Sequence, residues 1–95
     1  MSDVIEKAVA ALQAKFGGGF DASVKFDIED EGAILLDAEG VRAGDEPADC
    51  TLSADADTFQ AMLAGDLSPT AAFMSGRLKV DGDMGVAMRL GSALA

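Results

Sequence analysis

Apolar residues recur every three or four positions near the start of this chain and every second position in several short segments further on. The first spacing predicts an amphipathic helix over residues 3–16, whose apolar stripe is Ile5, Ala8, Val9, Leu12 and Phe16. Asp3 with Glu6 supplies an N-terminal cap followed by an acid three residues later. The glycines at 17–19 end this helix, because residues without a Cβ make its continuation costly.

The period-two segments predict strands. In residues 24–29 apolar and charged side chains alternate, so one face of the sheet packs on a core and the other faces water. A turn at 30–32 leads into a partner strand, 33–38, which predicts an antiparallel hairpin. Residues 39–49 predict a short edge strand and a loop, and two later strands are expected at 50–54 and 77–81.

Three more helices are predicted in the second half of the chain. Asp55 caps a helix that Gly65 closes, and Ser68 with Pro69 begins a short helix ending near Ser75. Asp83 caps the last helix, whose apolar positions spread over roughly 200° of the helical wheel, wider than one packing stripe requires. That helix is therefore expected to contact two apolar surfaces.

The element order predicts an α+β fold, with one mostly antiparallel sheet covered on one side by helices. A chain of 95 residues has room for one modest core, so residues 1–95 are expected to form a single domain. We expect Leu52, Leu63, Leu78 and Val80 to belong to that core.

Charge and segment composition narrow the range of functions. The formal net charge of −10 opposes binding to nucleic acid, whose affinity comes largely from lysine and arginine. No apolar run approaches the ~20 residues of a membrane span, and the amino end lacks a basic stretch and apolar block, which predicts a cytoplasmic protein. The basic side chains of the last third, Arg77, Lys79 and Arg89, are the ones expected to meet an anionic membrane surface. Alternatively, the acidic excess only keeps a small domain soluble.

Catalytic and metal-binding patterns are weak. The chain has no histidine, and its one cysteine, Cys50, is predicted to point inward, so no activated nucleophile is visible. Residues 27–32 are like a calcium loop, but Ala38 stands where the closing glutamate belongs. Acid pairs at 55–57 and 81–83 fit helix caps, and the triple glycine closes a helix instead of opening one around a phosphate. We therefore expect no enzyme, no metal and no cofactor.

A set of phenylalanine and methionine side chains is the most informative feature: Phe59, Met62, Phe73, Met74, Met84 and Met88. They fall in three successive predicted helices, and methionine adapts to irregular or changeable apolar volumes. The pattern by itself fits either an ordinary core or a cavity that holds a ligand.

Residues 48–55, 59–65 and 73–90 resemble the sterol carrier protein 2 (non-specific lipid-transfer) domain family. The family's ending reads as a Gly-Lys-Leu-Lys-Ile strand, a Gly-Asn turn and a Met-Gly-Leu-Ala-Met-Lys-Leu helix, and residues 76–90 follow it with mostly conservative changes. The resemblance is strong over residues 48–94, whereas the first 47 residues agree in element order and in the hairpin around Gly32.

The resemblance implies a five-stranded sheet covered by helices, with an apolar tunnel that takes fatty acids, fatty acyl-CoA, phospholipids or sterols without catalysis. We expect the lipid-binding side chains to be Phe59, Met62, Phe73, Met74, Met84, Met88, Leu90 and Leu94. The chain ends Ser92-Ala93-Leu94-Ala95, without a Ser-Lys-Leu-type peroxisomal address, and its loop before Ala48 is short. Both features are typical of a bacterial member and weigh against sterol as the ligand. The alternative is an accessory or dimerisation module whose apolar helical face packs on a partner protein.

Overall fold

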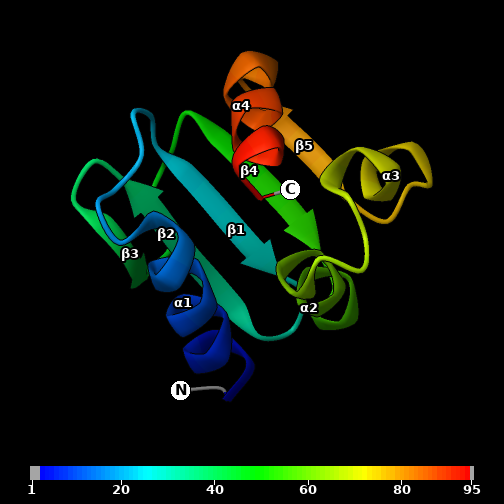
Figure 1. Ribbon diagram of the computed structural model, residues 1–95, viewed down its shortest axis with the longest axis horizontal. Coiled ribbons are helices and arrows are strands. Elements are labelled where there is room, and N and C mark those ends of the chain that lie inside the picture. Colours follow the sequence, from blue (N-terminus) through cyan, green and yellow to red (C-terminus); the bar gives the residue numbers. More distant parts are fainter. Residues whose placement is uncertain (1–2, 95) are drawn as a thin grey trace.

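The hairpin predicted around Gly32 lies within the sheet of the computed structural model, which describes residues 3–94 without the side chain of Leu94 (Figure 1). Strand β1 (Val24–Ile28) pairs antiparallel with β2 (Gly32–Asp37), and Phe26 lies opposite Ile34. The inward side chains of β1 are fully buried, as the alternation predicts. A hairpin register that buries every second residue fixes which face of the sheet receives the helices.

Three further strands complete a five-stranded sheet of order β3-β2-β1-β4-β5. Strand β3 (Gly40–Ala43) is antiparallel to β2, and β5 (Lys79–Gly82) is antiparallel to β4 (Cys50–Ala54). The expected mostly antiparallel α+β sheet is confirmed, with one exception at its centre.

That exception is the parallel pairing of β4 with β1, in which Phe26 lies beside Leu52. The two strands begin together because Asp49 N–H donates to Ser23 Oγ at 2.8 Å and Ser23 N–H donates to Asp49 Oδ2 at 3.2 Å. Alternation within each strand carries no information on direction, so the sequence pattern did not predict this pairing.

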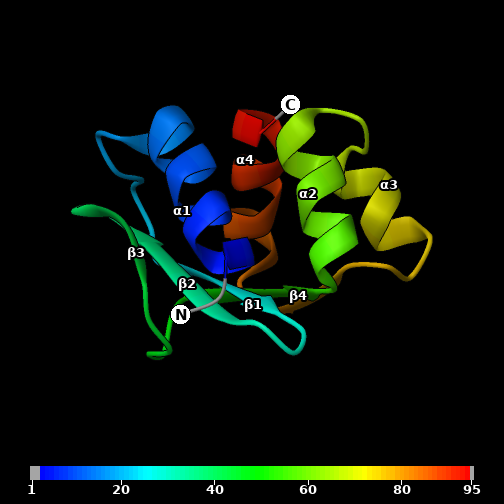
Figure 2. The same cartoon turned by 90° about the horizontal axis from the view of Figure 1, so that it is seen from below.

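The four helices of residues 3–94 cover the same face of the sheet, which Figure 2 shows from the side. They are α1 (Asp3–Phe16), α2 (Ala56–Ala64), α3 (Pro69–Met74) and α4 (Met84–Leu94). The caps predicted at Asp55, Ser68 and Asp83 are present: Asp55 accepts from Thr58 N–H at 2.7 Å, Ser68 from Ala71 N–H at 3.0 Å and Asp83 from Gly85 N–H at 2.8 Å. The cap predicted at Asp3 is wrong, because Asp3 is already the first residue of α1. Within residues 3–94 no helix is long and apolar enough to cross a bilayer.

The core lies between the sheet and the helices. Its largest fully buried side chains include Leu12, Ile34, Leu36 and Leu90. The rings of Phe26 and Phe59 meet edge to face, with their centroids 5.9 Å apart. This contact joins the middle of the sheet to α2.

Strand β5 begins two residues later than the alternation predicts. The backbone N–H groups of Arg77 and Leu78 both donate to the carbonyl of Ala72, at 2.9 and 3.1 Å. These bonds close the end of α3 and keep the two residues out of the sheet. Leu78 is nevertheless 3% exposed, so its inward orientation is confirmed.

Gly82 makes the close junction from which α4 starts. Its φ of +101° is costly for other residues, and a Cβ there would collide with the carbonyl oxygen of Asp49. Asp83 N–H donates to the same oxygen at 2.9 Å. We expect Gly82→Ala to lower the free energy of unfolding by more than ~2 kcal/mol in urea titrations, from backbone strain together with the collision.

Gly65→Ala is the matched control for this substitution. Gly65 also has a positive φ, +84°, but no atom lies within 4 Å of the Cβ position. We therefore expect a loss of only about 1 kcal/mol there, the cost of the left-handed conformation alone. Equal losses at the two sites would contradict the close-approach argument for Gly82.

Candidate functional site

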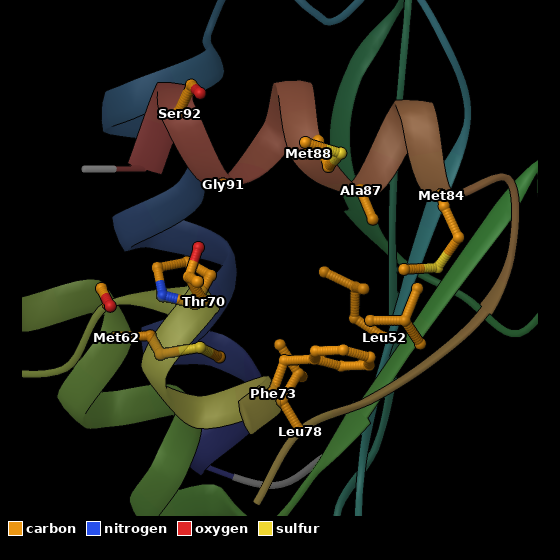
Figure 3. A pocket seen from close by; sticks show the side chains of 13 residues that line it. Leu52, Met62, Thr70, Phe73, Leu78, Met84, Ala87, Met88, Gly91 and Ser92 are labelled. Carbon is orange, nitrogen blue, oxygen red and sulfur yellow. The ribbon is translucent and has the colours of Figure 1, made fainter. Parts of the chain in front are cut away.

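A groove with a volume of about 460 Å³ lies between α3, α4 and the β4–β5 side of the sheet (Figure 3). Its floor is apolar and consists of Leu52, Leu78 and Val80. Met62 of α2 reaches the groove as well. Since Leu52 and Leu78 are each 3% exposed, the floor of the groove is also part of the core.

The first wall is α3 together with its N-cap, and it contributes Ser68, Pro69, Thr70 and Phe73. Pro at the first helical position suits the fixed φ of a helix start, and the Ser68 cap holds that turn in place. Only Ala72 is buried among the residues of α3. Most of α3 is therefore only partly covered by the rest of the protein.

The second wall is one face of α4. Met84, Ala87, Met88 and Gly91 recur at i, i+3, i+4 and i+7, so they share a helical face, and Ser92 extends it. Val86 and Leu90, at 4% and 0% exposure, point into the core instead. The contact of this helix with the core is thus confirmed, and its second apolar face borders the groove.

The groove is open along its rim. Phe73 is 45% exposed, Met84 47% and Met88 72%. Large apolar side chains in such contiguous exposure commonly mark a site for another molecule. The enclosed tunnel that the family resemblance implies stays a prediction, because this hollow has an open side.

The structure brings together four of the eight side chains expected to bind lipid: Met62, Phe73, Met84 and Met88 line the groove. Phe59 and Leu90 lie in the core, and Met74 is 81% exposed and outside the groove lining. The side chain of Leu94 lies outside the described residues. Contact of any of these residues with a ligand stays a prediction.

Sequence reasoning missed several lining residues. Leu52, Leu78 and Val80 were expected to be core only, yet they form the groove floor. Ala87 and Gly91 were also missed, although small residues four apart on an apolar helix indicate space beside that helix. A Cβ at Gly91 would lie 3.6 Å from the Cβ of Pro69, an ordinary contact distance, so this part of α4 lies beside the start of α3.

The described groove-lining residues are apolar or bear hydroxyl groups. This described lining carries no charged side chain. Cys50 of β4 is fully buried. Burial raises the pKa of its thiol, and the nearby carboxylates of Asp83 and Asp81 raise it further. A raised pKa keeps the thiol protonated and unreactive. Within residues 3–94 no three potential ligand side chains gather as a metal site.

The three basic side chains expected to meet a membrane do not form one patch. Arg77 and Lys79 border a separate depression that also includes Asp27, Glu29 and Asp55. Arg89 pairs with the carboxylate of Asp21, and its guanidinium lies 5.8 Å from the centre of the Phe20 ring. Arg89 is therefore engaged within the domain, away from the groove.

The model of the SCP-2 sterol transfer family matches residues 5–95. The chain belongs to this family. Among curated relatives, sterol carrier protein 2 of Homo sapiens is 34% identical over 84 residues, covering 86% of this chain, and hydroxysteroid dehydrogenase-like protein 2 of Bos taurus is 36% identical over 91 residues, covering 95%. The chain spans 14% and 21% of the length of these two proteins, so their other parts have no counterpart here.

Solved structures of SCP-2 proteins share the fold. The NMR structure of sterol carrier protein 2 from Aedes aegypti in complex with C16 fatty acid (palmitate) has a TM-score of 0.80 at 20% identity, covering 100% of this chain and 97% of that one. The apo form from Yarrowia lipolytica has a TM-score of 0.69 at 22% identity, covering 95% and 75%. The sheet and its helical cover are thus those of the SCP-2 fold.

Proposed function

We propose that this chain is a non-catalytic carrier that binds the hydrocarbon part of a lipid in the groove between α3 and α4. The observation that carries the proposal is an apolar groove of about 460 Å³ in a member of a sterol transfer family. Pockets for small molecules commonly measure about 300–1,000 Å³, and each buried methylene contributes about 0.8 kcal/mol. Fatty acids, fatty acyl-CoA, phospholipids and sterol-like molecules all present suitable hydrocarbon.

The palmitate-bound relative supports the same proposal. Palmitate is a single-chain lipid, and the fold of that relative matches this chain along its whole length. We infer that residues 1–95 act as one lipid-binding domain in the cytoplasm and need no cofactor. The free energy of dispersion and hydrophobic contacts grows with the length of the buried chain and depends on its shape, so we expect affinity to depend strongly on chain length.

Binding of a chain-length series tests this function. Purified protein is examined by native mass spectrometry for co-purifying lipid and then titrated with C8, C12 and C16 alcohols and acids that carry a fluorophore at the tail. Affinity is expected to rise with each added pair of methylenes until the groove is filled. Absence of both co-purified lipid and binding of every C16 probe would contradict the proposed function.

Contact with anionic membranes belongs to the same proposal, mainly through Arg77 and Lys79, since Arg89, the third residue expected to meet the membrane, is paired with Asp21. Each basic residue near an anionic surface contributes about 1 kcal/mol, and salt weakens that attraction. We expect Arg77→Glu with Lys79→Glu to slow lipid transfer to anionic vesicles severalfold at low salt, and Arg89→Glu to add little because Arg89 already pairs with Asp21. Transfer to zwitterionic vesicles is the control, and rates unchanged by salt and by all three reversals would contradict membrane contact through these residues.

The alternative function, an accessory or dimerisation module, is favoured by one observation. Met74 is 81% exposed without lining the groove, so the apolar surface extends past the groove rim. Such a surface fits a protein partner. A mass that rises with protein concentration, in a sample that binds no C16 probe, would favour this alternative over the carrier.

A further inference from the structure

The polar and apolar residues of the groove are separated along its length. Its hydroxyl-bearing side chains are Ser68 and Thr70 at the start of α3 and Ser92 in the last part of α4. The close approach of Gly91 to Pro69 brings these two segments together. Figure 3 shows Thr70 and Ser92 toward one end of the groove and Met84 with Leu52 toward the other.

The three hydroxyls are available to a ligand. Ser68 Oγ accepts a hydrogen bond from Ala71 N–H, so its own proton remains free to donate. For Thr70 and Ser92, no described protein group bonds the side-chain hydroxyl, and both residues are exposed. A hydroxyl both donates and accepts, so this end of the groove suits a polar group that does the same.

The same end is unsuited to an anionic head group. None of the described groove-lining residues is charged. Arg77 and Lys79 border a different depression, and Arg89 is paired with Asp21. The net charge of −10 gives a field that repels anions, and no described cation in the groove lining offsets that repulsion.

We infer that the groove selects single-chain lipids whose polar end is uncharged and bears hydroxyl groups, such as long-chain alcohols and monoacylglycerols, over the corresponding carboxylates. The polar end lies against Ser68, Thr70 and Ser92, and the chain runs toward Leu52 and Met84. This inference rests on the proposed function and adds the head-group class and its orientation to it.

Competition between hexadecanol and hexadecanoate tests the inference. Each displaces the same tail-labelled probe at pH 8 and low salt, below its own aggregation concentration. We expect hexadecanol to bind at least tenfold more tightly than hexadecanoate. Equal or tighter binding of hexadecanoate would overturn the inference while leaving the lipid-carrier function intact, whereas failure of both to bind would overturn the proposed function itself.

Two variants test the orientation. The double variant Thr70→Val with Ser92→Ala removes two hydroxyls and is expected to weaken the binding of hexadecanol three- to tenfold. The control Ser75→Ala, at the other end of α3 and outside the groove, is expected to leave that binding unchanged. Thr70→Lys supplies a cation and is expected to strengthen hexadecanoate at least tenfold with little change for hexadecanol. An unchanged alcohol-to-acid ratio in both variants would show that the head group lies elsewhere.

Discussion

Replacing Met88 by Asp is expected to lower the affinity for a tail-labelled C16 alcohol by about ten- to a hundredfold. Met88 lies on the α4 wall of the groove and is 72% exposed in the empty protein, so the new carboxylate is hydrated before binding. A bound chain would cover that carboxylate and remove its water, which costs free energy without supplying a partner. Because tenfold in affinity is about 1.4 kcal/mol, this range corresponds to a partial loss of hydration.

The stability of the empty protein separates this effect from unfolding. An exposed substitution is expected to change the free energy of unfolding by less than about 0.5 kcal/mol, which circular dichroism in urea measures. Met74→Asp is the matched control, since Met74 is 81% exposed on the neighbouring helix but outside the groove lining. Full probe affinity in a folded Met88→Asp variant would remove Met88 from the binding surface.

Phe26→Ala is expected to cost about 3–5 kcal/mol of the free energy of unfolding, a large share of the roughly 5–15 kcal/mol that holds a native domain together. Phe26 is 2% exposed, and its ring packs edge to face on Phe59. Truncation removes both the buried area and this aromatic contact, and it leaves a cavity at the centre of the sheet. Urea titration measures the loss.

Phe73→Ala makes the same chemical change at the groove rim. Because Phe73 is 45% exposed, we expect a loss of stability under about 1 kcal/mol together with weaker probe binding. Phe26→Ala should thus have the larger effect on stability, and Phe73→Ala the larger effect on probe binding. A larger stability loss at Phe73 than at Phe26 would contradict the division into core and groove.

Much of the fold is predictable because single residues determine where elements begin and end. Asp55, Ser68 and Gly65 have the backbone roles that their chemistry favours, and the alternation in β1 fixed its buried face. The parallel pairing of β1 with β4 was not predictable, because it depends on the tie between Ser23 and Asp49, far apart in sequence.

The candidate site was predictable only in part, for a related physical reason. Hydrophobicity identifies Met84 and Leu90 alike, but the packing of α4 decides that Leu90 faces the core and Met84 the groove. Leu78 shows that the two classes also overlap, because its side chain is buried in the core and at the same time forms part of the groove floor. Small residues such as Gly91 contribute by the space they leave, which a search for large apolar side chains overlooks.

The parallel pairing of β1 with β4 also bears on the order of folding. Helix α1 and strands β1 to β3 are connected by short loops, so their contacts close at low entropic cost and can form first. Strand β4 must then find the free edge of β1, and β5 and α4 can dock only after it. Every described groove-lining residue lies between Leu52 and Ser92, so the groove is expected to be the last part of the domain to assemble.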